Sequence, residues 1–189
     1  MALKIIGVGG TNRPNSQSYL ALEAALSDLE KHGADVQAFK LYDLQLPMYD
    51  PIKSLNYYGD NVRIFVEGIQ QADAVILSTA SYHGILPGIM KNAMDFLDFT
   101  DAGPRPYLSG RAVGLMATGG SEHGASTTID SMVHMVHALR GVVVPATVPI
   151  DRAWERFDRH TIIDEKIARR VRQMTAGLMQ LSGQLQPAG

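Results

Sequence analysis

Sequence patterns typical of a buried strand and of a helix alternate five times along this chain. Apolar runs indicate strands at residues 3–8, 36–41, 74–79, 112–117 and 141–144. After each run, apolar residues recur at helical spacing, over residues 16–32, 61–71, 87–97, 129–136 and 163–181. Parallel strands need crossover connections of one hand, so this order predicts an α/β fold with helices on both faces of a parallel sheet.

The length and composition predict one compact domain that spans residues 1–189. Two domains would each fall below the usual size of roughly 100–150 residues. Hydrophobic residues make up 46% of the chain and charged residues 19%, which is the balance of a globular protein. The chain contains no cysteine, so disulfides, thiolate chemistry and cysteine-ligated metal centres are excluded.

The charge and the N-terminus indicate where such a protein works. The formal net charge is −2, which gives no reason to expect nucleic acid or an anionic membrane as a partner. The apolar run at the N-terminus is too short for a secretion signal and has no cleavage-like ending. No stretch of the sequence approaches the roughly 18–20 apolar residues of a membrane span. We therefore expect a soluble, cytoplasmic protein.

Three predicted strands are followed by polar loops that contain glycine. The first loop covers residues 9–18, the second residues 79–88 and the third residues 117–126. In an open parallel sheet, ligands bind outside the carboxyl ends of the strands, near the point where the strand order reverses. The three loops therefore predict one ligand site at one edge of the sheet.

The first loop has the chemistry of an anion-binding turn. Gly9 and Gly10 permit a tight turn with exposed N–H groups, and the helix that begins near Ser16 offers its positive end. Arg13 adds a fixed positive charge, and hydroxyls come from Thr11, Ser16 and Ser18. A plain polar turn in which Ser16 only caps the helix is an equal alternative. The loop matches neither the Rossmann nor the P-loop glycine pattern, which disfavours a dinucleotide bound there.

The second and third loops suit a flat ligand. Gly84 permits close approach of the backbone, and Tyr82 offers stacking or a hydrogen bond, with packing under the loop as its alternative. His83 could contact such a ligand or could simply be an exposed polar residue at the tip of the loop. The third loop supplies backbone donors through its segment 119–121, whereas His123 suits either a ligand contact or the plain surface.

Four motifs, in the same order, resemble those of the NAD(P)H-dependent FMN reductases, which include quinone, azo and chromate reductases. The family motif G-S-x-R-x-x-S-x-N/S aligns with Gly10–Ser18, and L-P-x-Y-N/D aligns with Leu46–Asp50. The motif P-x-Y-N-G-x-x-P-G-x-x-K-N-A-x-D aligns with residues 80–95, and T-G-G-S stands at Thr118–Ser121. The resemblance implies a flavodoxin-like three-layer sandwich with a five-stranded parallel sheet in the order 2-1-3-4-5.

The resemblance also implies bound FMN and places its contacts. The FMN phosphate would be held by Thr11, Arg13, Ser16, Gln17 and Ser18. The isoalloxazine ring would be lined by Ser81, Tyr82, His83 and Gly84, and closed on its other side by Gly119, Gly120 and Ser121. Two positions depart from the family pattern, because Ala80 replaces its usual proline and His83 its usual asparagine. The contact at His83 and the stiffness of the second loop are expected to differ accordingly.

A flavin carries its own redox chemistry, so no catalytic side chain and no metal ion is required. The expected reaction is hydride transfer from NADPH or NADH to FMN and onward to a small acceptor, such as a flavin, quinone, azo compound or metal oxyanion. The alternative is a flavodoxin-type electron carrier without nicotinamide oxidation. Such carriers usually have T/S-x-T-G-N-T in the first loop and are strongly acidic, unlike this chain with Arg13 and its net charge of −2.

Other classes of site have weaker support in the sequence. His134 and His137 have a spacing that puts both imidazoles near one helix face, but no neighbouring ligand completes a metal site. Ser121 and His123 are too close in sequence for a nucleophile and its base. Trp154 either covers a site or packs a loop on the domain.

The resemblance further implies a homodimer or homotetramer, with the connection at residues 41–60 reaching toward a partner subunit.

Overall fold

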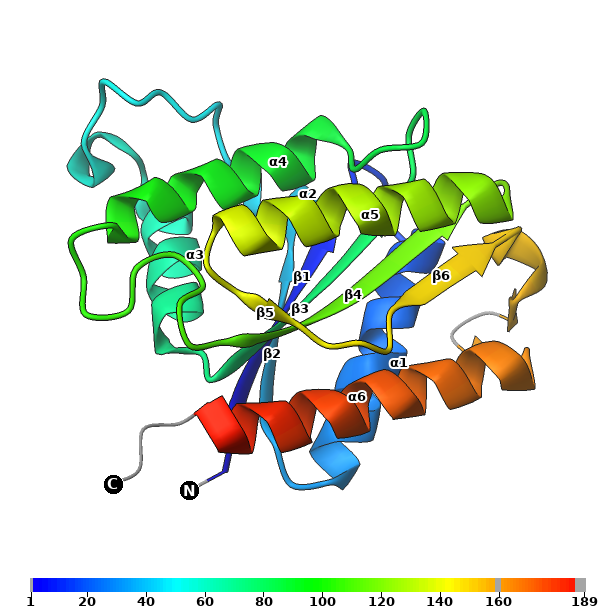
Figure 1. The fold of residues 1–189 in the computed structure, drawn as a ribbon. Helices are drawn as coiled ribbons and strands as arrows, with labels where there is room; N and C mark the ends of the chain where they lie inside the picture. Colours follow the sequence, from blue (N-terminus) through cyan, green and yellow to red (C-terminus); the bar gives the residue numbers. More distant parts are fainter. Residues whose placement is uncertain (1, 159–160, 186–189) are drawn as a thin grey trace.

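The computed structural model describes residues 2–158 and 161–185. Every predicted strand and helix is present (Figure 1), with one strand divided in two. The elements are β1 Lys4–Gly10, α1 Gln17–Lys31, β2 Asp35–Lys40, α2 Leu41–Leu44, η1 Leu55–Tyr57, α3 Asp60–Gln71, β3 Ala74–Ala80, α4 Gly88–Asp95, η2 Phe96–Thr100, β4 Ala112–Gly119, α5 Glu122–Ala138, β5 Val142–Val143, β6 Val148–Asp151, η3 Ala153–Glu155, β7 Phe157–Asp158, β8 Thr161–Ile162 and α6 Glu165–Leu185.

The sheet has the order β2-β1-β3-β4-β5 and its strands are parallel, which confirms the predicted order. The predicted fifth strand is divided, because β5 and β6 both pair with β4. Val142 lies opposite Ala112 and Val148 opposite Met116, so the second piece is displaced by two residues relative to the first. Pro145 stands between the pieces, and proline cannot donate a hydrogen bond to the ladder.

Helices cover both faces of the sheet and form the predicted three layers. On one face, α1 and α6 pack their apolar residues on the sheet, with Leu22, Leu29 and Met174 completely or almost completely buried. On the other face, α3, α4 and α5 do the same through residues such as Phe65 and Met132 (Figure 1). The inner strands are buried except for one half-buried residue at an end of each, because helices lie on both sides of them.

The carboxyl ends of four strands lie in one row. Gly10 at the end of β1 is paired with Thr79 of β3, and Ala80 of β3 is paired with Thr118 of β4. At the end of β4, Gly119 is paired with Asp151 of β6. The first, second and third loops therefore start from adjacent positions along one edge of the sheet, as the sequence predicts.

The opposite edge of the sheet contains a buried arginine. The Arg111 side chain is fully buried and donates hydrogen bonds to main-chain carbonyls, including those of Gln70 and Ala72 at the C-terminal end of α3. Burial lowers the pKa of Arg111 to about 10, so the guanidinium stays charged at neutral pH. A cation at the negative end of a helix is stabilising, so Arg111 joins α3 to the start of β4.

The connection between β2 and α3 is long but well anchored. Asn92 of α4 accepts a hydrogen bond from the Tyr49 N–H at 2.8 Å and donates one to the Pro47 carbonyl at 2.8 Å. The Tyr58 hydroxyl is 2.7 Å from the N–H of Asp50. These contacts hold residues 47–50 against α4, beside the first loop. In the described part of the chain, no helix is long and apolar enough to cross a membrane.

Candidate functional site

The first loop is held in place from beneath by Tyr19. The Tyr19 hydroxyl donates to the Thr11 carbonyl at 2.9 Å and accepts the Tyr42 N–H at 3.1 Å. Burial raises the pKa of Tyr19, so the hydroxyl keeps its proton. Gly9 lies against the same ring, and a Cβ atom there would come within 2.2 Å of it. Glycine is therefore required at this position by the close approach of the ring.

Several polar groups of the first loop lack a partner. The Thr11 side chain is 1% exposed, and its Oγ1 atom has no hydrogen-bond partner among the described residues. Ser16 caps α1, and its Oγ atom lies 2.9 Å from that of Ser18. Within the same described residues, no hydrogen bond uses the N–H of Gln17 or Ser18 in the first turn of α1. This combination of an unpaired hydroxyl and a positive helix end suits an anion.

The second loop contains a tight turn. Tyr82 and Ile85 exchange two main-chain hydrogen bonds of 3.1 and 3.2 Å, and His83 and Gly84 between them have φ values of 56° and 77°. Histidine, asparagine and glycine all occur in this left-handed region more readily than other residues. His83 is therefore compatible with the backbone that the family's asparagine would adopt. Tyr82 is 41% exposed, so its ring is not packed under the loop.

Ser81 joins the second loop to the third. Its N–H donates to the Thr118 carbonyl at 2.7 Å, and its hydroxyl donates to the Gly124 carbonyl at 2.9 Å. The same hydroxyl lies 2.8 Å from Oγ1 of Thr128, which donates to it from α5. The polar groups of Ser81 are therefore already engaged within the protein. Its predicted place beside a ligand rests on the position of its backbone rather than on an unpaired side chain.

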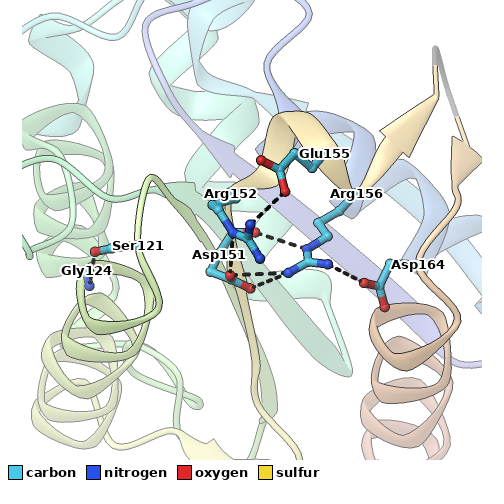
Figure 2. Close-up of polar contacts among 7 residues, drawn as sticks. All are labelled: Ser121, Gly124, Asp151, Arg152, Glu155, Arg156 and Asp164. Atoms are coloured by element: carbon cyan, nitrogen blue, oxygen red, sulfur yellow. Dashed lines mark hydrogen bonds and ion pairs between the residues drawn. The ribbon is translucent and has the colours of Figure 1, made fainter.

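The third loop is a close-packed turn from β4 into α5. A Cβ atom on Gly119 would lie 3.1 Å from the N–H nitrogen of Ala125 and 3.4 Å from Cβ of Ser81. Ser121 caps α5, and its Oγ atom accepts the Gly124 N–H at 3.1 Å (Figure 2). Gly120 is exposed, as is His123. Gly119 is therefore packed closely between Ala125 and Ser81, and the exposed Gly120 follows it at the end of β4.

A charged cluster at the end of β6 is part of this edge and was not predicted from the sequence. Arg156 binds Asp151 at 3.3 Å and Asp164 at 2.7 Å (Figure 2). Arg152 binds Asp151 at 3.3 Å and Glu155 at 3.0 Å. Burial acts to raise the pKa of Asp151, but hydrogen bonds and charges from both arginines hold it below its usual value. The alternating charges of residues 151–156 are the signal that could have indicated such a cluster.

Two cavities differ in their relation to the loops. One, of about 360 Å³, lies between the first loop, the residue 42–48 connection and the start of α4, with Asn12, Leu46 and Gly88 in its lining. A larger one, of about 470 Å³, lies between α1 and α6, away from the strand ends, and its lining mixes acidic and basic side chains. Only the first adjoins the predicted site. Across the described ranges, no three acidic or histidine side chains gather as a metal site would require.

The fold is flavodoxin-like. The structure of FerB, an NAD(P)H:acceptor oxidoreductase from Paracoccus denitrificans, superposes with a TM-score of 0.78 at 18% identity, over 97% of this chain and 98% of the other. This similarity confirms the fold predicted from the sequence. The order of strands and the three-layer arrangement are the features that the two proteins share.

Sequence comparison gives the family. The profile of the NADPH-dependent FMN reductases matches residues 3–155. The chain is 25% identical over 171 residues to an FMN reductase (NADPH) of Pseudomonas aeruginosa, covering 89% of this chain and 87% of the relative. It is 28% identical over 141 residues to an FMN-dependent NADPH-azoreductase of Staphylococcus haemolyticus, covering 67% and 71%. The chain therefore belongs to the NADPH-dependent FMN reductase family, whose members are oxidoreductases that depend on FMN and a reduced nicotinamide.

Proposed function

We propose that the first loop holds the phosphate of FMN. The observation that carries the proposal is the buried Oγ1 atom of Thr11, which has no partner among the described residues and lies in the loop that precedes α1. A phosphate oxygen there would satisfy it, together with the N–H groups of Gln17 and Ser18 and the hydroxyl of Ser16. The exposed guanidinium of Arg13 would add a charge-assisted contact.

The isoalloxazine ring would then lie against the second and third loops. The backbone of Ser81–Gly84 and that of Gly119–Ser121 would line it, because Ser81 holds these loops together by hydrogen bonds. His83 and Gly84 form the tip of a tight turn, so their N–H groups lie at a loop end rather than in a ladder. Backbone donors near the ring would stabilise the negative charge that develops on reduction.

When bound, FMN would supply the redox chemistry, the transfer of a hydride from NADPH or NADH and of electrons to a small acceptor. Flavins, quinones, azo compounds and metal oxyanions are the proposed acceptor classes. The residues of this chain bind and orient the flavin and keep one face of the site open. No side chain is assigned a catalytic role, because the reacting atoms belong to the flavin, the nicotinamide and the acceptor.

Anaerobic reduction tests the proposal. The purified FMN-loaded protein is mixed with NADPH and then with NADH in the absence of air, and flavin absorbance is recorded. We expect the yellow absorbance to bleach with at least one nicotinamide and to return when a quinone is added. If neither nicotinamide bleaches the flavin while dithionite does, the protein is instead a flavodoxin-type electron carrier.

Three further features belong to the same proposal. Residues 1–189 form a single FMN-binding domain that works in the cytoplasm, which cell fractionation would test. The domain assembles as a homodimer or homotetramer through its long connection, where Met48 is 79% and Ile52 89% exposed. Light scattering after size exclusion should give a multiple of the 20.6 kDa chain mass, and a monomer at micromolar concentration would exclude the assembly.

A further inference from the structure

The single tryptophan of the chain stands at the end of the row of strand ends. Trp154 lies in the short η3 turn that follows β6, and its side chain is 60% exposed. The far edge of its six-membered ring lies 3.9 to 4.0 Å from the position of a Cβ atom built on Gly120. The indole therefore lies beside the exposed Gly120, at the distance where a side chain at that position would touch it, while most of its surface faces solvent. An exposed aromatic ring beside a loop of the strand-end row is available to stack on a flat ligand.

The turn that carries Trp154 is held firmly. Arg152 has a φ of 41°, in the left-handed region that residues with side chains rarely adopt. Strained backbone of this kind persists only where the surrounding structure fixes it. Here the fixing contacts are ion pairs of Arg152 with Asp151 and Glu155, and of Arg156 with Asp151 and Asp164 (Figure 2). The first residue of the turn, Ala153, is almost fully buried beneath it.

A second exposed aromatic ring lies on the other side of the third loop. Tyr82 follows β3, whereas Trp154 follows β6, and the third loop begins at the end of β4 between these two strands. The two residues therefore follow the strands on either side of β4, whose loop carries the exposed Gly120. The inference drawn from these two residues rests on the proposed function, in which Gly119 and Gly120 line the flavin ring.

We propose that Trp154 is a specificity-determining residue that forms one wall of the electron-acceptor site and favours planar aromatic acceptors. Its indole offers a fixed, polarisable surface on which a ring can stack beside the flavin, at little entropic cost because the turn is already held. A quinone fits this description, since it is flat and takes two electrons and two protons to become the hydroquinone. Inorganic acceptors have no ring to stack and gain nothing from the indole.

Steady-state kinetics of the FMN-loaded protein with NADPH test the proposal with two acceptors. A naphthoquinone sulfonate represents the planar class, and ferricyanide represents acceptors without a ring. Trp154→Ala should raise the KM for the quinone about three- to tenfold, the loss expected for one aromatic contact. The KM for ferricyanide should stay within about twofold of the wild-type value. Trp154→Phe keeps a ring and should restore most of the quinone affinity.

A matched control and a binding measurement complete the test. Ile163 is also 60% exposed and follows the same charged segment, so Ile163→Ala should leave both KM values unchanged. Because Trp154 is the only tryptophan, acrylamide quenching of its emission reports on its exposure directly. In oxidised, FMN-loaded protein without nicotinamide, the naphthoquinone sulfonate binds without turnover and should reduce that quenching.

Three results would overturn the proposal. One is an equal change in KM for both acceptors, and another is acrylamide quenching that the quinone does not alter. The third is a smaller assembly in Trp154→Ala with an unchanged quinone KM, which would assign the ring to a subunit contact. A wild-type flavin that no nicotinamide bleaches is a different outcome, because it refutes the proposed function and removes the acceptor site with it.

Discussion

The first and second loops follow neighbouring strands of the same sheet, but a buried hydroxyl of the first loop is unpaired in the part of the chain that the structure describes, whereas a hydroxyl of the second loop is hydrogen-bonded. In the first loop, the buried Oγ1 atom of Thr11 has no partner within the described residues. In the second loop, Ser81 uses its N–H once and its hydroxyl twice in hydrogen bonds to the third loop and α5. Both side chains are hydroxyls near the same edge, so the residue type alone does not distinguish them.

This difference separates a hydroxyl proposed to bind the ligand, that of Thr11, from a hydroxyl that supports the fold, that of Ser81. An unsatisfied buried hydroxyl costs free energy in the empty protein, and that cost is recovered when a ligand supplies the partner. A hydroxyl that is already satisfied contributes to folding whether or not a ligand is present. The comparison therefore predicts that substitutions in the two loops act on different measured quantities, stability in one case and cofactor affinity in the other.

Ser81→Ala should give the largest effect, and it should fall on stability. The change removes the hydrogen bond to the Gly124 carbonyl and one of the two acceptors near Oγ1 of Thr128, so the free energy of unfolding should drop by about 1–3 kcal/mol. Urea unfolding of the protein without FMN measures this. Ser126→Ala, on the same helix α5, is the control and should cost far less. Retained stability with a large loss of FMN affinity would contradict the assignment of Ser81 to support.

Thr11→Val should lower the affinity for FMN without lowering the stability of the protein that lacks FMN. Valine has nearly the shape of threonine but no hydroxyl, so FMN affinity should fall about tenfold for one lost contact to a phosphate. The unfolding free energy without FMN should stay unchanged or rise, because a buried unpaired hydroxyl is removed. Titration followed by flavin fluorescence measures the affinity. Thr11→Ser is the matched control, and equal affinities for the valine and serine variants would remove the hydroxyl from the phosphate site.

His83→Asn should give the smallest effect. Asparagine tolerates the left-handed backbone at a φ of 56°, so thermal unfolding and FMN affinity should both stay close to the wild-type values. His83→Ala is the contrasting variant, because an ordinary side chain in that region costs about 1–2 kcal/mol. A strong loss of FMN affinity in His83→Asn would show that the imidazole contacts the flavin directly, and the family's asparagine could not replace it.

The alternating pattern of the sequence predicts most of the fold because each element carries its own signal. The apolar runs near Val8 and Leu77 are buried on both faces, and helical spacing marks residues such as Leu22 and Met174 on the faces that the sheet covers. The division of the fifth strand was missed, because a run such as 141–144 does not reveal where pairing will stop. The small β7–β8 hairpin was missed for the same reason, since two-residue strands have no periodicity to detect.

The meeting of the three loops at one edge of the sheet was predictable, whereas the contacts made by their residues were not. Strand ends of a parallel sheet lie at one edge, so the order of strands and loops was enough to bring the three loops together. That Ser81 binds α5, and that Asp151 lies beside Gly119, depends on contacts between segments far apart in the chain. The role of Asn92 was hidden as well, because its motif gives the residue but not its two hydrogen bonds to residues 47–49.

The row of paired strand ends has a consequence for how the site can change. The pairs Gly10–Thr79, Ala80–Thr118 and Gly119–Asp151 are set by main-chain hydrogen bonds, which do not depend on side-chain identity. Slipping one strand by a single residue would move its loop by roughly 3.3 Å and exchange the side chains that its two faces present to the helices, so the packed core resists it. The spacing between the loops is thus inherited from the core. The side chains of the loops can therefore be replaced, as a change of electron acceptor would require, while the spacing between the loops stays the same.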